Sequence, residues 1–136
     1  MSIADRGTGL KTVLAANVTD LVQIFAPNEL TDTPNEFPCA MIIPGNTEYD
    51  ADFQGDFDVA FRLIVLVGRP DVPSAMNKIL DFMDLSGTSS IYKAVNDNPT
   101  LDGSADTSRV LRSTGVGFTQ WGVETYISAE FEITAQ

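Results

Sequence analysis

The chain of 136 residues contains no histidine and only one cysteine. The lack of histidine removes the Ser-His-Asp and Cys-His nucleophilic arrangements and the usual zinc sites. A single cysteine cannot form an internal disulfide, which agrees with a reducing cytoplasm. We expect Cys39, which lies between Pro38 and Ala40, to be a small core residue, because no nearby cation or helix N-terminus activates its thiol. An enzyme is therefore the least favoured function class.

Positive charge is also scarce. The formal net charge is −11, and no lysine or arginine lies between Lys11 and Arg62. That interval carries the acidic residues Asp20, Glu29, Asp32, Glu36, Glu48, Asp50, Asp52, Asp56 and Asp58. Such a surface repels nucleic-acid phosphates and anionic lipid, so specific nucleic-acid recognition and membrane binding are disfavoured. DNA could still pass such a surface without sticking, and the acidic segment could equally serve solubility alone.

Long hydrophobic runs are missing as well. No segment approaches the roughly 20 apolar residues that a membrane span needs, and the first residues lack the basic and then apolar pattern of a signal peptide. A hydrophobic content of 43% and a charged content of 20% fit an ordinary globular protein. The length predicts one domain over residues 1–136.

The strongest pattern that is present runs from residue 56 to residue 85. The apolar residues Phe57, Val59 and Phe61 occupy every second position and should face inward, and from Leu63 onward both faces are apolar. This pattern predicts a central strand over 57–67. The strand is stopped by the Gly68–Asp71 turn. A helix is then predicted over Met76–Leu85, because a single apolar stripe repeats at helical spacing. The stripe consists of Met76, Ile79, Leu80 and Met83.

Two further helices are predicted. The first opens with a capping box formed by Ser2 and Asp5 and ends near Asn17. Its apolar face consists of Ile3, Leu10, Val13 and Leu14, and Gly7 and Gly9 weaken it. The second is a short helix capped by a serine at position 89 or 90, with Ile91, Tyr92 and Val95 on its buried side.

Further strands are predicted over residues 21–25, 38–43, about 108–118 and 123–134. Pro44 and Gly45 should end the second of these, an acidic connection should follow over 48–55, and Gly115 and Gly117 suggest a bulge. In the last strand, Val123, Ile127, Ala129, Phe131 and Ile133 should face inward, and Glu124, Tyr126, Glu130 and Glu132 outward. Together the segments predict an α+β domain, with a largely antiparallel sheet of four to five strands and helices packed on one face.

One acidic pattern resembles part of a metal site. Asp50-x-Asp52-x-Gln54-Gly55 matches the first half of an EF-hand loop. The position of the bidentate glutamate is taken by Phe61, and no helix flanks the loop, so we expect no metal or cofactor site and favour an acidic turn or a subunit contact. Trp121 is expected to be a core residue at a strand end, with an exposed anchor for a partner as the alternative.

The chain as a whole resembles the tail terminator, or tail completion, proteins of long-tailed bacteriophages with flexible tails. The resemblance is carried in order along the chain by Ser2-Ile-Ala-Asp5, Gly9-Leu10-Lys11, Pro38-Cys-Ala-Met-Ile-Ile-Pro-Gly45, Val65-Leu-Val-Gly-Arg69, the Met76–Leu85 helix ending in Asp84-Leu-Ser-Gly87, Asn98-Pro-Thr-Leu101 and Tyr126-Ile-Ser-Ala-Glu-Phe131. Each motif records the fold rather than a chemical activity.

The resemblance implies a structural protein of the virion that assembles in the host bacterial cytoplasm. Its subunits would form a ring, typically a hexamer, on the head-proximal end of the tail tube, stop tube polymerisation and present a surface for joining the head. The implied partners are further copies of the chain, the major tail tube protein and a head–tail connector or neck protein. The alternatives are another neck component, such as a head-closure or minor tail protein, and a calcium-dependent or small-ligand binding module.

The resemblance transfers no catalytic residues. From the residues themselves we predict that two polar loops, the acidic loop Glu48–Asp56 and the loop Asn28–Pro38, supply the subunit contacts, because long loops in a compact chain are more often functional than idle. The candidate contact residues are Glu29, Asp32, Glu36, Glu48, Asp50, Asp52 and Asp56.

Overall fold

The structure is a computed structural model that describes residues 2–31, 34, 36–49, 57–68 and 74–136. Within these residues, three helices and five strands follow one another. They are α1 (Ile3–Asn17), β1 (Gln23–Phe25), β2 (Cys39–Tyr49), β3 (Phe57–Gly68), α2 (Ser74–Met83), α3 (Ile91–Asp97), β4 (Ser108–Trp121) and β5 (Glu124–Ala135). The described residues form an α+β fold, as the sequence predicted.

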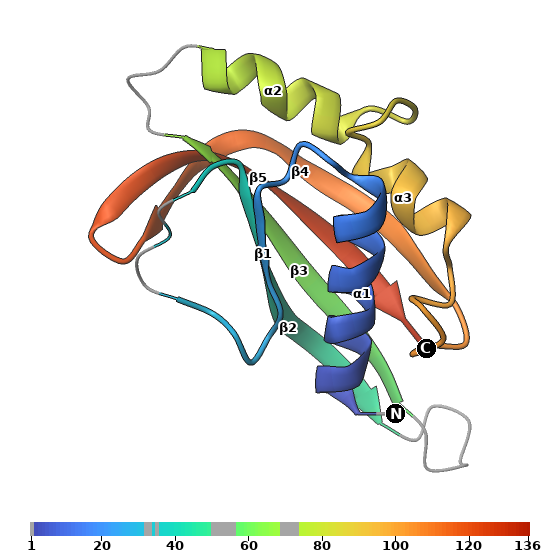
Figure 1. The fold of residues 1–136 in the computed structure, drawn as a ribbon. Helices are drawn as coiled ribbons and strands as arrows, with labels where there is room; N and C mark the ends of the chain where they lie inside the picture. Colours follow the sequence, from blue (N-terminus) through green and yellow to red (C-terminus); the bar gives the residue numbers. More distant parts are fainter. Residues whose placement is uncertain (1, 32–33, 35, 50–56, 69–73) are drawn as a thin grey trace.

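The strands form one twisted sheet in the order β1-β2-β3-β5-β4, and the three helices gather on one side of it (Figure 1). Strand β1 pairs with β2 in parallel, and the other three pairings are antiparallel. The predicted central strand is confirmed, because β3 lies between β2 and β5 in the middle of the sheet. The largely antiparallel sheet and the one-sided helices are confirmed as well.

Helix α1 begins and ends as its sequence predicts. The Ser2 side chain accepts a hydrogen bond from the Asp5 backbone N–H, and the Asp5 side chain accepts one from the Ser2 backbone N–H. These bonds satisfy two of the backbone donors that a helix start leaves free, and the pKa of Asp5 is lowered by them. Gly7 and Gly9 have a second role besides weakening the helix: both are buried at close approaches to other segments.

The main core lies between the helices and the sheet. It takes its largest contributions from the inward positions of β3 and β5, where Phe61, Leu63, Phe131 and Ile133 are almost completely buried. All three helices add side chains to this one cluster, namely Leu10, Val13, Leu14, Ile79, Phe82, Ile91, Ala94 and Val95. A single core of this kind is what a one-layer sheet covered by helices produces.

Several strands run further than their sequences predict. Strand β2 does not stop at Pro44 and Gly45 but continues to Tyr49, with a register shift between Pro44 and Thr47. The shift accommodates the proline, which cannot donate to the ladder. Strand β4 likewise continues past Phe118 to Trp121, and a register shift between Ser113 and Val116 confirms the predicted bulge at Gly115.

Four residues differ from their predicted burial. Leu80 and Tyr92 are 59% and 38% exposed, because α2 buries Phe82 beside the correctly predicted Ile79 and α3 buries Ala94. The side chain of Met76 lies outside the described part of the chain. Val123 is 90% exposed, because it occupies the turn of the β4–β5 hairpin rather than β5. Tyr126, predicted to face solvent, is buried.

Tyr126 is buried because the opposite face of the sheet carries a second, smaller core. Cys39, Met41, Ile64 and Leu66 form it with Tyr126, and the segment before β2 folds over this cluster. The Phe37 ring packs against Tyr126 with 5.1 Å between ring centroids. Trp121 packs against the same cluster and donates a hydrogen bond from Nε1 to the backbone oxygen of Thr31 at 2.6 Å, in agreement with its predicted core role.

Candidate assembly interface

The described residues show neither a cluster of metal ligands nor an exposed thiol. No group of three or more cysteine, aspartate or glutamate side chains within them is arranged to bind a metal. Cys39 is buried, and its burial raises the pKa of the thiol to about 12, so the reactive thiolate is disfavoured. Within the same residues, no helix is long and apolar enough to cross a bilayer. Surfaces for contact with other chains are more prominent.

The two outer edges of the sheet are the clearest such surfaces. Strands β1 and β4 occupy opposite ends of the sheet, and no described strand pairs with the outer edge of either. An outer edge presents backbone N–H and C=O groups that can pair with a strand of another chain. The fold therefore carries two potential strand-pairing surfaces, one at each edge of the sheet.

Strand β4 combines an open edge with exposed apolar side chains. Phe118 is 67% exposed although it lies in the regular part of a strand, and Leu111 and Val116 are also exposed. Val116 and Phe118 lie opposite Ala129 and Ile127 of β5, which places them on the helix-covered face at its margin. Arg109 and Arg112 lie opposite Thr134 and Glu132 on the other face. The strand contains no acidic residue, so it forms a basic edge in an acidic protein.

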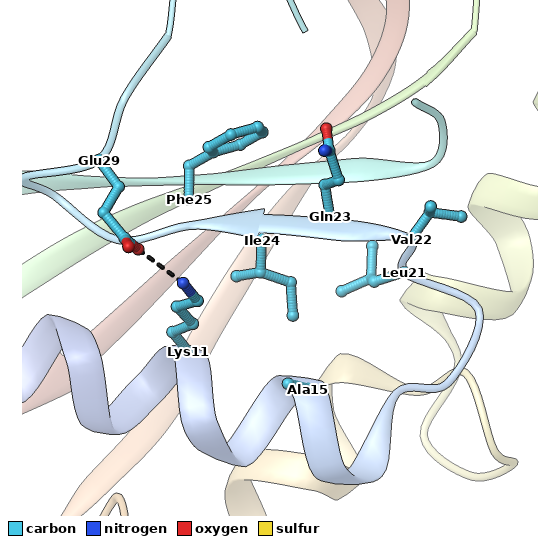
Figure 2. Close-up of a pocket in the computed structure, with 8 residues that line it drawn as sticks. All are labelled: Lys11, Ala15, Leu21, Val22, Gln23, Ile24, Phe25 and Glu29. Atoms are coloured by element: carbon cyan, nitrogen blue, oxygen red, sulfur yellow. Dashed lines mark hydrogen bonds and ion pairs between the residues drawn. The ribbon is translucent and has the colours of Figure 1, made fainter. Parts of the chain in front are cut away.

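Strand β1 borders an open groove at the other end of the sheet. The groove lies between α1 and β1, has a volume of about 610 Å³ and is lined mainly by Lys11, Ala15, Val22, Ile24 and Glu29. In the close-up, Ile24 points toward α1, whereas Gln23 and Phe25 point to the opposite side of the strand (Figure 2). Val22 is 54% exposed at the entry to the strand. An apolar side chain from another molecule would find apolar surface along this edge.

One of the predicted contact residues lies at this groove. Glu29 forms an ion pair with Lys11, with 2.7 Å between Nζ and Oε1, as the dashed line in Figure 2 marks. The hydrogen bond from Lys11 and a second from the Ala26 backbone N–H lower the pKa of Glu29. The pair is partly exposed, so it contributes little to stability, but it fixes a carboxylate at the rim of the groove.

The structure separates the remaining predicted contact residues. Glu36 is exposed on the segment before β2. Glu48 lies in β2 opposite Asp58 of β3, so it belongs to the sheet rather than to the predicted acidic loop. Asp32, Asp50, Asp52 and Asp56 lie outside the described residues, as does the pattern that resembles half of an EF-hand.

Sequence reasoning missed the β4 edge. Val116 and Phe118 alternate with smaller residues as buried strand residues do, so the pattern alone favours a core position. Only the place of β4 at the end of the sheet exposes them. The shortage of acidic residues in β4 was the one available signal, because it stands out against a net charge of −11.

The face of the sheet opposite the helices also carries, beside the second core, an alternating row of charges across β3, β5 and β4. Arg62 forms an ion pair with Glu130, and Arg112 forms one with Glu132 at 2.7 Å between Nε and Oε2. The hydrogen bond to Glu130 raises the pKa of Arg62. These side chains line a hollow of about 220 Å³ beside Gly45. Since each charge already has a partner, the row stabilises the sheet surface more readily than it binds a charged ligand.

Comparison with known proteins gives no further identification. No protein-family model matches the chain, and no curated protein matches it.

Proposed function

We propose that this protein is a tail terminator of a long-tailed, flexible-tailed bacteriophage. Its subunits form a ring on the head-proximal end of the tail tube, stop the tube from growing and present the surface that joins the head. The role is structural rather than catalytic, the site of action is the head–tail junction of the virion, and the partners are the major tail tube protein and a neck protein. The observation that carries the proposal is the pair of open strand edges at opposite ends of one sheet.

Two different edges on one subunit suit a ring. A contact between unlike surfaces is repeated from each subunit to the next, and it closes into a ring when the rotation between neighbours permits. A chain with one self-complementary surface would instead stop at a dimer. The resemblance of the sequence to tail terminators supplies the biological context, and the ring is the assembly that this resemblance implies.

The charge of the chain supports the same proposal. DNA must cross the head–tail junction, and a ring with a net charge of −11 per subunit would not hold the phosphate backbone. A basic or mixed lining would retard the passing DNA. An acidic ring is thus compatible with a conduit for nucleic acid that does not recognise it.

A nonsense codon early in the gene tests the proposal. Without a terminator the tube has no stop, because identical head-to-tail contacts continue indefinitely. We expect mutant lysates to contain overlong, headless tubes beside filled heads in electron micrographs, and supply of the intact gene in trans should restore normal particles. Tails of normal length that fail to join heads would instead identify a head-closure protein, and normal infectious particles would exclude both roles.

A further inference from the structure

We infer that the ring contact is a strand pairing in which β4 of one copy adds to the outer edge of β1 of the next copy. This inference rests on the proposed ring and specifies the surfaces that build it. Strands β1 and β4 are the two ends of the sheet, and neither outer edge pairs with a described strand. Joining them would make the sheets of neighbouring subunits continuous.

The strand directions decide how the two edges meet. According to the pairings across the sheet, β1, β2 and β5 run in one direction, and β3 and β4 run in the opposite direction. Rotation about a ring axis parallel to the strands preserves these directions and keeps each face on the same side. Strand β4 therefore meets β1 of the next copy in the antiparallel sense, with helix-covered faces continuous.

The faces of the strands and the groove select a register. Residues opposite one another in an antiparallel pair point to the same face, and both Phe118 and Ile24 belong to the helix-covered face. Placing Phe118 opposite Ile24 of the next copy inserts its ring into the groove between β1 and α1, which has a volume of about 610 Å³. Gln120 then lies opposite Val22.

The charges favour this pairing over its main rival. The β1 edge that receives β4 carries no charged side chain from Val22 to Phe25. Pairing β4 with a second β4 would instead bring together two edges that carry arginines and no acidic residue.

The bulges of β4 limit the length of the contact. Register shifts lie between Val110 and Arg112 and between Ser113 and Val116, so only the part from Val116 to Trp121 is regular. Bulges of this kind protect an edge from indiscriminate pairing. The regular part is long enough to pair with all three residues of β1. In this pairing its exposed Phe118 lies at the groove between α1 and β1.

The first test removes the apolar anchor. Phe118→Asp changes a side chain that is 67% exposed in the single chain, so the fold should survive, which a thermal melt verifies. Val123→Asp is the matched control, because Val123 is exposed in the hairpin turn outside the pairing edge. In sedimentation velocity across a concentration series, we expect Phe118→Asp to weaken self-association roughly tenfold or more, and Val123→Asp to leave it unchanged.

The second test reports the register. Under oxidation, a variant carrying both Val22→Cys and Gln120→Cys should give a ladder of cross-linked species up to the ring size. Mixed single variants should give only dimers, and the wild-type chain, whose single cysteine is buried, should give none. Cross-linking by Gln120→Cys alone would identify pairing of β4 with β4 and overturn the inference.

The two tests also separate this inference from the proposed function. If Phe118→Asp still forms rings like those of the wild type, and the double-cysteine variant does not cross-link, the edge contact is overturned but the proposed ring is retained. Cross-linked chains that stay open-ended would keep the contact and reject the ring. A wild-type chain that remains monomeric at every concentration and does not cross-link would reject both.

Discussion

Replacing Gly9 with alanine sets two physical effects against each other. Gly9 lies inside α1, where alanine is the better helix former by about 1 kcal/mol. A Cβ atom at this position, however, would lie within 3.0 Å of the Leu101 backbone oxygen and of the Ser104 side chain, a separation that real Cβ atoms essentially never show. Helix propensity predicts stabilisation, and packing predicts the opposite.

The packing effect should dominate, because the 101–104 turn, which lies against Gly9, cannot easily move. Leu101 is fully buried, and it and Asp102 adopt left-handed backbone conformations with φ of 48° and 58°. The Leu101 oxygen also accepts hydrogen bonds from the backbone N–H and the hydroxyl of Ser104. Overpacking against such a turn costs about 3 kcal/mol. After the gain in helix propensity, a net loss of about 2 kcal/mol remains.

Thermal unfolding followed by circular dichroism measures this loss. For a chain of 136 residues, about 2 kcal/mol corresponds to a midpoint lower by about 7 °C. The control is Thr8→Ala, because Thr8 is exposed on the same helix and its replacement changes helix propensity alone. A Gly9→Ala midpoint at or above the wild-type value would show that the close approach of α1 to the 101–104 turn is wrong.

Two further predictions concern the second core. Ile64→Asp should lower the free energy of unfolding by several kcal/mol, comparable to the whole stability, because an unpaired charge would enter an apolar cluster at a site that is 5% exposed. The control is Leu80→Asp at an exposed site in α2, which should be tolerated. A soluble Ile64→Asp protein that unfolds at the wild-type midpoint, as the control does, would refute the placement of Ile64. The Cys39 thiol, whose pKa burial raises to about 12 from 9.0, should resist a thiol reagent at pH 8 until denaturant is added. Because the unfolded chain loses this proton first, the stability contributed by the neutral thiol should decline as pH rises above 9.0, and Cys39→Ala should remove that decline.

The local elements could be predicted because their causes are local. The capping box of α1, the serine cap of α3, the central strand β3 and the bulge at Gly115 each depend on neighbouring residues, and each is present in the structure. Periodicity failed at Tyr126 because a segment distant in the chain packs on it. Tyr126 was predicted to be exposed, but the segment carrying Phe37 covers it from the other side of the sheet.

The approximate positions of the helices and strands, the α+β class and the acidic character of the chain follow from the residues alone, since propensity, periodicity and charge are local properties. Strand order belongs to the tertiary structure, because pairing joins residues far apart in the chain. That order puts β1 and β4 at the ends of the sheet and leaves Phe118 exposed, although its alternation resembles that of a core strand. It also turns Gly9 from a weak point of a helix into a packing requirement, because only the folded chain brings Leu101 and Ser104 against it.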